Sequence, residues 1–295
     1  MSELLRIDRI SKGFDGKAVI RDIGFALEPG RVYGLLGRNG EGKTTLIRTI
    51  MGVIPRDAGI ISFKGQAVTF GSVQYKKEIG YIPEDPFFYG GMTVGGLLAF
   101  NGRFFPRWDA GKASGDLKRL SLDASARIRT LSRGQQLKLG FVVALAARPE
   151  LLILDDPTSG LDVPTRQEFL RDVIRELADG GTAVLFATHL VHELERIVDH
   201  LFILHGGRIV LDETYEKVKS LTRRVTLGFD AEPPLITSPG NAIGRRQLGR
   251  DVEFVIYPWD EERERTVRSL GSARLEIEAL SLEDIFASFV REEAK

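Results

Sequence analysis

Residues 32–50 read VYGLLGRNGEGKTTLIRTI, and this stretch decides the fold. Its centre, from Gly37 to Thr44, fits the pattern G-x-x-x-x-G-K-[ST], which is known as Walker A. The apolar residues before it predict a buried strand, and those after it predict a helix. We therefore predict a phosphate-binding loop at the point where a strand passes into a helix.

The loop suits the phosphates of a nucleoside triphosphate. Its glycines let the backbone turn tightly and direct N–H groups at phosphate oxygens, while the helix points its positive end at the same anion. In this pattern Lys43 reaches the β and γ phosphates and the Thr44 hydroxyl binds Mg²⁺. A dinucleotide fold is the nearest alternative, but Gly34, Gly37 and Gly40 are spaced three apart and do not fit G-x-G-x-x-G. The predicted phosphate-binding residues are Gly37, Arg38, Asn39, Gly40, Gly42, Lys43, Thr44 and Thr45.

The composition is that of an ordinary globular protein. The chain has 295 residues, of which 43% are hydrophobic and 28% charged, and this length allows one large domain and a smaller one. Because 41 basic residues balance 41 acidic ones, we expect no nucleic-acid partner. The absence of Cys excludes disulfides and thiolate metal sites. We see no signal peptide and no apolar run near the ~20 residues of a membrane span, so we expect a cytoplasmic protein.

Carboxylates and a histidine follow two further predicted strands. Asp155 and Asp156 come directly after residues 151–154, an apolar run typical of a central parallel strand. Open α/β sheets bind ligands beside the carboxyl ends of their strands, so we predict that Asp155 binds Mg²⁺ and that Asp156 is the base for the attacking water. His189 follows a strand predicted at residues 182–187 and is a candidate contact of the γ phosphate. A lone histidine is more often a satisfied core residue.

Three other features are less specific on their own. Phe14 lies in a predicted turn, where its ring could stack on a nucleotide base or simply pack. Glu84 lies in a carboxylate-rich loop after a strand predicted at residues 79–82. Residues 131–135, LSRGQ, begin a helix that ends near residue 147, and a Ser before a helix is usually just a cap.

The pattern of apolar and polar residues changes after about residue 220. Alternating segments predict strands at residues 223–229, 242–248, 251–257 and 273–279, with a helix at residues 260–270. A capping box at Ser281 predicts a final helix to about residue 293. We predict a small α+β appendage with no catalytic residue, and a regulatory or dimer-stabilising role stays open.

Taken in order, these motifs resemble the ATP-binding subunit of ABC transporters over residues 1–220. The resemblance implies ATP and Mg²⁺ as cofactors, with Phe14 stacked on adenine and His189 as the switch histidine. LSRGQ stands at the position of the family signature, and residues 159–162 at that of its dimer-contact loop. The resemblance also implies that Thr44, Glu84 and Asp155 bind the metal, and that Asp156, His189 and Glu84 form the catalytic group.

The resemblance implies an α/β fold with a P-loop NTPase core. The core has a mainly parallel sheet, an N-terminal antiparallel β part and a helical insertion at about residues 93–147. We expect the ATP-binding domain to occupy residues 1–220 and a C-terminal accessory domain residues 221–295.

The family mechanism implied by the resemblance requires two such subunits. They pack head to tail around two ATP molecules, and the pair reopens once the γ phosphate is lost. A membrane permease subunit follows this motion, which places the chain on the cytoplasmic face of the membrane. The single nucleotide domain and the tail are most similar to exporter-type subunits that pair with separate permease chains. The residues expected to act on the partner's ATP are Ser132, Gly134 and Gln135, and Asp162 of the dimer-contact loop is a further expected nucleotide-binding residue.

Three positions depart from the family pattern. Asp156 replaces the usual Glu, which withdraws the carboxylate by ~1 to 1.5 Å, and a misplacement of this size can cost ~100-fold in rate. Glu84 replaces the usual Gln and adds negative charge beside the phosphates, although its carboxylate can still bind Mg²⁺. Arg133 lies inside the signature, where we expect it to face solvent.

Two hypotheses about function follow from these departures. In the first, the chain hydrolyses ATP slowly, with Asp156 aligning the water. In the second, it is an ATP-binding switch in a heterodimer whose partner performs the hydrolysis. A soluble translation or repair ATPase usually carries two such domains or a long coiled coil, and a GTPase carries Asn-Lys-x-Asp; we find none of these features.

Overall fold

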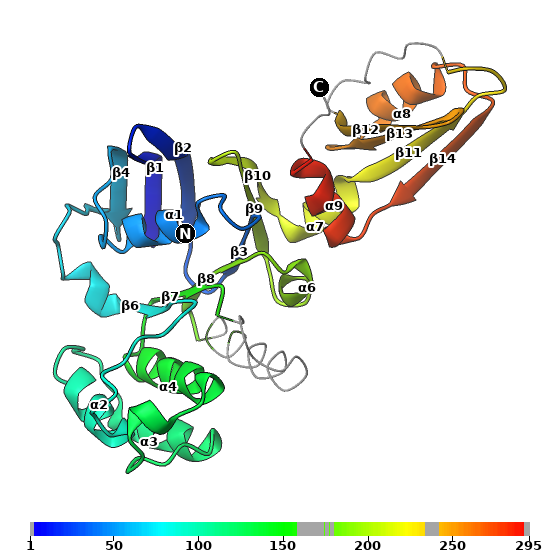
Figure 1. Ribbon diagram of the computed structural model, residues 1–295. Coiled ribbons are helices and arrows are strands. Elements are labelled where there is room, and N and C mark those ends of the chain that lie inside the picture. Colours follow the sequence, from blue (N-terminus) through cyan, green and yellow to red (C-terminus); the bar gives the residue numbers. More distant parts are fainter. Residues whose placement is uncertain (1–2, 158–173, 175–176, 178–179, 234–241, 292–295) are drawn as a thin grey trace.

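The computed structural model describes residues 3–157, 174, 177, 180–233 and 242–291. These residues form three sheets and a group of helices that lies apart from the C-terminal sheet (Figure 1). Within this part of the chain, no helix is long and apolar enough to cross a membrane.

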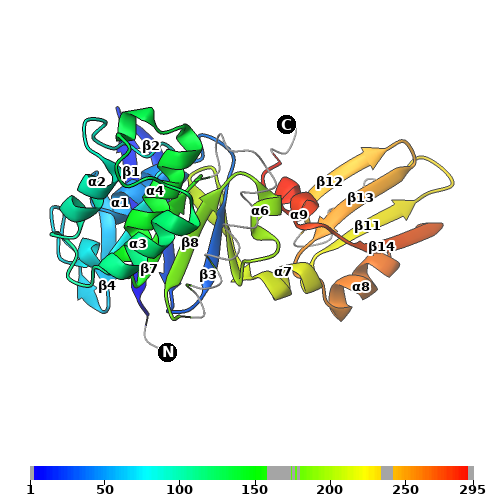
Figure 2. The same cartoon turned by 90° about the horizontal axis from the view of Figure 1, so that it is seen from below.

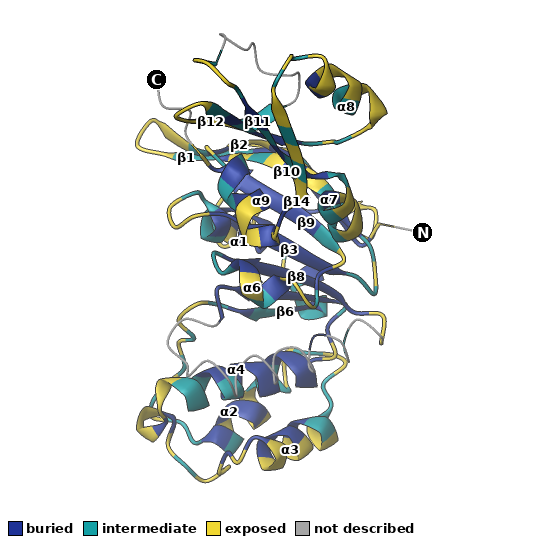
Figure 3. Cartoon of the chain, turned by 90° about the vertical axis from the view of Figure 1, so that its right-hand side faces the viewer, coloured by how far each residue is buried: buried dark blue, intermediate teal, exposed yellow. Residues whose placement is uncertain are grey.

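The central sheet has six strands in the order β10-β9-β3-β8-β7-β6. Strands β3, β6, β7, β8 and β9 run parallel, and β10 pairs antiparallel with β9. All residues of β3, β7 and β8 are buried, which explains why their sequences are continuous apolar runs (Figure 3). The strands are β3 (Val32–Leu36), β6 (Ile79–Ile82), β7 (Leu151–Asp155), β8 (Ala183–Thr188), β9 (His200–His205) and β10 (Arg208–Thr214).

An antiparallel sheet of four strands, in the order β2-β1-β4-β5, covers one side of the central sheet. Helix α1 (Lys43–Ile50) lies in the core between the two sheets, where Leu46 and Ile47 share a cluster with residues of both. The N-terminal segment forms two long antiparallel strands, in keeping with the expected N-terminal antiparallel β part. The strands are β1 (Leu5–Phe14), β2 (Lys17–Leu27), β4 (Ala58–Phe63) and β5 (Gln66–Ala67).

Helix α4 (Arg133–Ala146) joins the helical group to the central sheet. Leu137 and Phe141 pack against strand residues of the sheet, while Leu139 and Val142 belong to the separate core of the helical group. Both faces of α4 are therefore buried, and the helix holds the two parts together. The remaining helices are α2 (Val94–Asn101), α3 (Ala110–Arg119) and the short 3-10 turns η1 (Tyr75–Glu78) and η2 (Ile128–Thr130).

The third sheet is C-terminal and antiparallel, in the order β12-β13-β11-β14 (Figure 2). Helix α8 packs against it, and its Val267 is buried with Val225 and Phe254 of the sheet. The elements predicted after residue 220 are found, with bounds that differ by at most a few residues. They are β11 (Arg223–Gly228), β12 (Ala242–Leu248), β13 (Asp251–Ile256), α8 (Glu261–Arg268), β14 (Arg274–Ala279) and α9 (Leu282–Phe289). Two short helices that were not predicted, α6 (Val191–Leu194) and α7 (Tyr215–Leu221), precede them.

Helix α9 leaves the C-terminal sheet and packs against α6 and β9 of the central part. Ser281 caps it by accepting the N–H of Asp284 at 3.1 Å. The helix ends before the predicted residue 293, because Val290 turns out of it and is buried. Ile285 and Phe286 share one apolar cluster with Val191 and other residues of the central part. The division at residue 220 stays a prediction, since this core runs across it.

We expect Phe186→Ala to destabilise the protein by about 3 to 5 kcal/mol. Phe186 lies in β8 and is fully buried, so its truncation leaves a cavity in the central sheet. The free energy of unfolding, measured with a chemical denaturant, checks this. Phe70→Ala is the matched control, because that ring is 58% exposed and should lose almost nothing. Equal losses for both variants would contradict the described core.

Candidate functional site

A cleft of about 350 Å³ opens where the loop after β3 faces the carboxyl ends of β7 and β8. The three strands end level with one another, since Leu36 pairs with Thr188 and Asp155 with Ala187. The cleft brings together most of the residues predicted from separate motifs. It is lined by Val19, Asn39, Gly40, Gly42, Lys43, Thr44, Thr45, Glu84, Asp156 and His189.

The phosphate loop depends on glycines with positive φ angles. Gly40 has φ 87° and Gly42 has φ 104°, conformations that L side chains rarely adopt. A Cβ at Gly42 would lie 2.8 Å from Ile20 Cγ2, so this position also lacks space. Helix α1 starts at the next residue with no side-chain cap and no acidic residue in its first turn. Its first N–H groups are therefore available to an anion.

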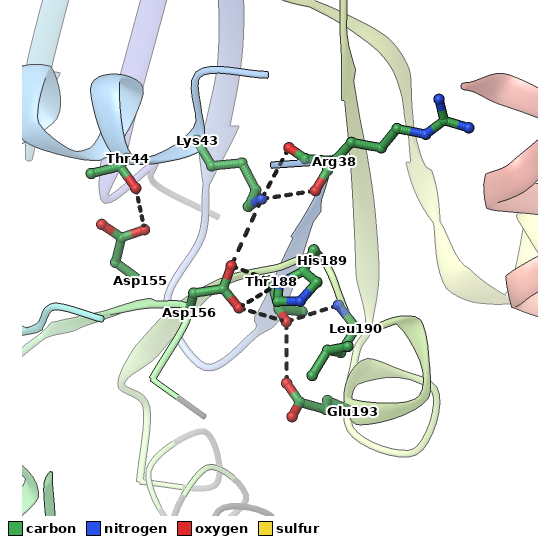
Figure 4. A network of polar contacts seen from close by, with 10 residues as sticks. Arg38, Lys43, Thr44, Asp155, Asp156, Thr188, His189, Leu190 and Glu193 are labelled. Carbon is green, nitrogen blue, oxygen red and sulfur yellow. Dashed lines mark hydrogen bonds and ion pairs between the residues drawn. The ribbon is translucent and has the colours of Figure 1, made fainter. Parts of the chain in front are cut away.

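Lys43 is a buried cation beside two carboxylates. Its ammonium donates to the carbonyl oxygens of Gly37 at 2.8 Å and Arg38 at 3.3 Å, and lies 3.8 Å from Asp156 Oδ2 (Figure 4). Burial lowers the pKa of Lys43, and the charges of Asp156 and Asp155 oppose this effect. A phosphate oxygen could replace the carbonyl partners without moving the lysine far.

Thr44 and Asp155 form an oxygen pair at the start of α1. The Thr44 hydroxyl donates to Asp155 Oδ1 at 3.1 Å, and the Tyr81 hydroxyl donates to Oδ2 at 3.4 Å. Burial raises the pKa of Asp155, while the hydrogen bond from Thr44 lowers it. Burial, with the charge of Asp155 as a further cause, raises the pKa of Tyr81 to about 12. Tyr81 therefore stays a neutral donor to the carboxylate.

These oxygens fit a magnesium ion that arrives with a nucleotide. Hydroxyl and carboxylate oxygens are the hard ligands that Mg²⁺ prefers, and the ion is usually held by one or two carboxylates together with substrate phosphates. Among the described residues, no group of three or more His, Cys, Asp or Glu could hold a metal alone. Glu84 lines the same cleft as Thr44, and its role as a metal ligand stays a prediction.

Asp156 and His189 face each other across the end of the sheet. Both carboxylate oxygens of Asp156 lie 3.0 Å from His189 Nδ1, and its backbone N–H donates to the Ala187 carbonyl at 2.8 Å. Asp156 has φ 47°, in the left-handed region where Asp is among the few non-glycine residues that are common. The backbone therefore gives a physical reason for a short acid at this position.

The sequence did not predict a polar contact between the phosphate loop and residues 205–206 at the end of β9. Glu41 Oε1 lies 2.9 Å from His205 Nδ1, and Glu41 Oε2 accepts the Gly206 N–H at 2.7 Å. The loop pattern allows any residue at Glu41, and its partners are more than 160 residues away in sequence. The only sign in the sequence is that an acid lies inside the pattern, two residues before Lys43.

Thr188 and Glu193 extend the network around Asp156 and were also missed. The Thr188 hydroxyl lies 3.2 Å from Asp156 Oδ1 and 3.1 Å from Glu193 Oε2. Thr188 directly precedes His189, which is the signal that could have found it. Val19 and Tyr81 reach the site from β2 and β6, and their sequence context gave no sign of this.

Other predicted site residues lie outside the cleft. The Phe14 ring is 47% exposed, does not line the cleft and has the Lys12 ammonium 5.2 Å from its centre. Asp162 lies outside the described residues. Their roles at a nucleotide stay predictions.

The signature residues form the start of α4. Ser132 and Gln135 make a reciprocal capping box, in which Ser132 Oγ accepts the Gln135 N–H at 3.3 Å and Gln135 Oε1 accepts the Ser132 N–H at 2.9 Å. Gly134 lies in the first turn, away from the cleft of the same chain. Arg133 is exposed to solvent, as expected, and its guanidinium also pairs with the exposed Asp85 at 2.6 Å. The signature is thus tied to the loop that carries Glu84.

Comparison with known proteins decides the family. Residues 20–159 match the family described as ABC transporter. The ABC transporter ATP-binding protein YtrB of Bacillus subtilis is 30% identical over 283 residues, which cover 96% of this chain and 97% of that protein. The chain belongs to the ATP-binding proteins of ABC transporters.

Further relatives of this ABC subunit support the same family assignment. The Nod factor export ATP-binding protein I of Sinorhizobium fredii is 29% identical over 299 residues, covering 99% of this chain and 87% of that protein. The bacitracin transport ATP-binding protein BcrA of Bacillus licheniformis is 30% identical over 227 residues, covering 76% and 74%. A solved structure of an ATP-binding subunit of an ABC transporter matches with a TM-score of 0.69 and 30% identity, over 74% of this chain and 92% of that one.

These matches confirm the predicted α/β fold with a P-loop NTPase core. ABC ATP-binding subunits bind ATP, generally with Mg²⁺, and couple its hydrolysis to transport. They generally dimerise and pair with membrane permease subunits. The roles of individual residues in this ABC subunit are not tested by the matches and stay predictions.

We expect Lys43→Ala to weaken ATP binding by about 100-fold, since a charge-assisted hydrogen bond contributes up to ~3 kcal/mol. Calorimetric titration of the purified chain with ATP and Mg²⁺ measures the affinity. Lys76→Ala is the control, because that ammonium donates to the Gly52 carbonyl outside the cleft. Unchanged affinity in Lys43→Ala would refute the assignment of the phosphate loop.

Phe14→Ala should weaken ATP binding while leaving the binding of inorganic tripolyphosphate unchanged. Stacking of a base on an aromatic ring is worth about 1 to 3 kcal/mol, so we expect a loss of affinity for ATP of about 5- to 150-fold. Phe70→Ala, another exposed ring, serves as the control. If both ligands lose affinity equally, Phe14 does not stack on adenine.

Proposed function

We propose that this chain is the ATP-hydrolysing subunit that drives a membrane permease of an ABC exporter, through ATP-dependent closure of a dimer. The convergence of Lys43, the Thr44 and Asp155 pair, and Asp156 with His189 on one cleft carries the proposal. A relative named for Nod factor export supports the direction.

The phosphate loop and the start of α1 bind ATP before hydrolysis. The N–H groups around Gly40 and Gly42 bind the phosphates, and Lys43 exchanges its backbone carbonyl partners for the β and γ phosphate oxygens. Thr44 and Asp155 would hold Mg²⁺, with Glu84 as a further ligand, and bound Mg²⁺ would supply positive charge beside the phosphates.

Asp156 is the proposed base for the attacking water. Its carboxylate is fixed by His189 at 3.0 Å and lies 3.8 Å from the Lys43 ammonium, at the edge of the cleft. It accepts the proton of the water, while His189 orients the carboxylate and contacts the γ phosphate. Because Asp is shorter than Glu by one methylene, we propose that hydrolysis is slow.

Closure of a dimer completes the site. Ser132, Gly134 and Gln135 lie at the N-terminus of α4, away from the cleft of their own chain, so they act on the nucleotide of a second subunit. Loss of the γ phosphate removes an anion that bridges two positive surfaces, and the dimer opens.

The permease docks near the Glu84 loop and the helical group. Phe87 and Tyr89 follow Glu84 and are 87% and 64% exposed, which leaves two aromatic rings uncovered beside α4. Through this contact the chain lies on the cytoplasmic face of the membrane.

A second candidate is a switch subunit in a heterodimer, which binds ATP and closes but leaves hydrolysis to its partner. The observation that favours it is the short Asp156 side chain, whose oxygens are already engaged by His189 and Thr188. Both candidates require ATP binding. They differ in whether the purified chain turns ATP over.

Steady-state ATPase measurements on the native chain, Asp156→Asn and Asp156→Glu decide between the two. We expect slow native turnover, a loss of about 100-fold in Asp156→Asn and an increase in Asp156→Glu, whose carboxylate reaches further. Asp22→Asn is the control, since Asp22 has a similar φ of 54° but lies outside the cleft. ATP binding without turnover in the native chain, with turnover in Asp156→Glu, would favour the switch subunit.

A further inference from the structure

One threonine hydroxyl connects the proposed base with a second carboxylate. Thr188 is the last residue of β8 and is fully buried. Its Oγ lies 3.2 Å from Asp156 Oδ1 and 3.1 Å from Glu193 Oε2, and it accepts the Leu190 N–H at 3.0 Å (Figure 4). The hydroxyl therefore lies between the two acids.

A hydroxyl has one hydrogen, so the two bonds to the acids are alternatives. When Thr188 donates to Asp156, it occupies an oxygen that the attacking water would need as an acceptor. When it donates to Glu193, that oxygen of Asp156 keeps its contact with His189 Nδ1 at 3.0 Å and has a further lone pair for the water. The two carboxylates compete for one hydroxyl hydrogen. Which of them receives it decides whether Asp156 Oδ1 can accept a hydrogen bond from the attacking water.

We propose that Glu193 is a positioning residue for the hydrolysis reaction, acting through Thr188. Glu193 draws the hydroxyl hydrogen away from Asp156 and so leaves the carboxylate of the base free to accept from water. This inference rests on the proposed role of Asp156, and it assigns a function to two residues outside the sequence motifs.

The surroundings of Glu193 hold it in place for this role. It lies on the short helix α6, whose Val191 and Leu194 are buried. These two residues belong to the same apolar cluster as Ile285 and Phe286 of α9. The C-terminal helix thus fixes the position of α6 next to the site, and Glu193 is held within reach of Thr188.

A purely structural role is the competing explanation. Thr188 accepts the Leu190 N–H just before α6, and Glu193 is an acid in the first turn of that helix. Both features could simply stabilise α6. If Glu193 only stabilised α6, Glu193→Ala would lower the stability of the protein. Its effect on kcat would then be the same with or without the Thr188 hydroxyl.

The test is a double-mutant cycle on the full-length chain. We expect Glu193→Ala to lower kcat for ATP about tenfold with KM unchanged, because the hydroxyl then stays on Asp156. In a Thr188→Val background, Glu193→Ala should have no further effect on kcat, since no hydroxyl remains to redirect. Thr188→Ser keeps the hydroxyl and should retain the response to Glu193→Ala.

Glu195→Ala is the matched control, because Glu195 follows α6 and pairs with Lys219 at 3.7 Å outside the cleft. Its kcat should equal that of the native chain. Equal losses of kcat from Glu193→Ala in both backgrounds, or a parallel fall in the melting temperature, would overturn the inference. Absence of turnover in the native chain would instead refute the proposed hydrolysis and, with it, the role of Glu193.

Discussion

The buried charges of Lys43, Asp155 and Asp156 are the constraint on which the rest of the structure depends. An isolated charge at this depth would be costly, and removal of one partner would leave the others uncompensated. The three groups meet because β8 lies between β3 and β7, with their carboxyl ends level. The order of strands in the sheet therefore decides the chemistry of the cleft.

Much of the core could be predicted because strands buried on both faces leave a simple trace in the sequence. The apolar runs at β3, β6 and β7 predicted those strands within one residue of their bounds. The elements less deeply buried were harder to predict. The N-terminal strands mix buried and exposed residues and contain irregular pairing, so their pattern in the sequence is weaker.

The candidate site could be predicted where a local motif determines it, and could not where distant residues meet. The glycines and Lys43 form a local turn, so their spacing was sufficient. The contact of Glu41 with His205 joins segments far apart in the chain, and the pairing of Arg133 with Asp85 depends on how the helical group packs. The left-handed backbone of Asp156 depends on its place at a strand end. None of these leaves a pattern in the sequence.

Helix α9 has a consequence for how this chain can vary among relatives. Its apolar residues and those of α6 form one interior, so the C-terminal part and the nucleotide-binding part are not interchangeable modules. A chimera that takes its C-terminal sheet from a relative inherits a foreign α9, which must fit the native α6 and β9. Substitutions on α9 and on the residues of α6 and β9 that it contacts are therefore expected to occur in compensating pairs, as at the interface of a permanent dimer.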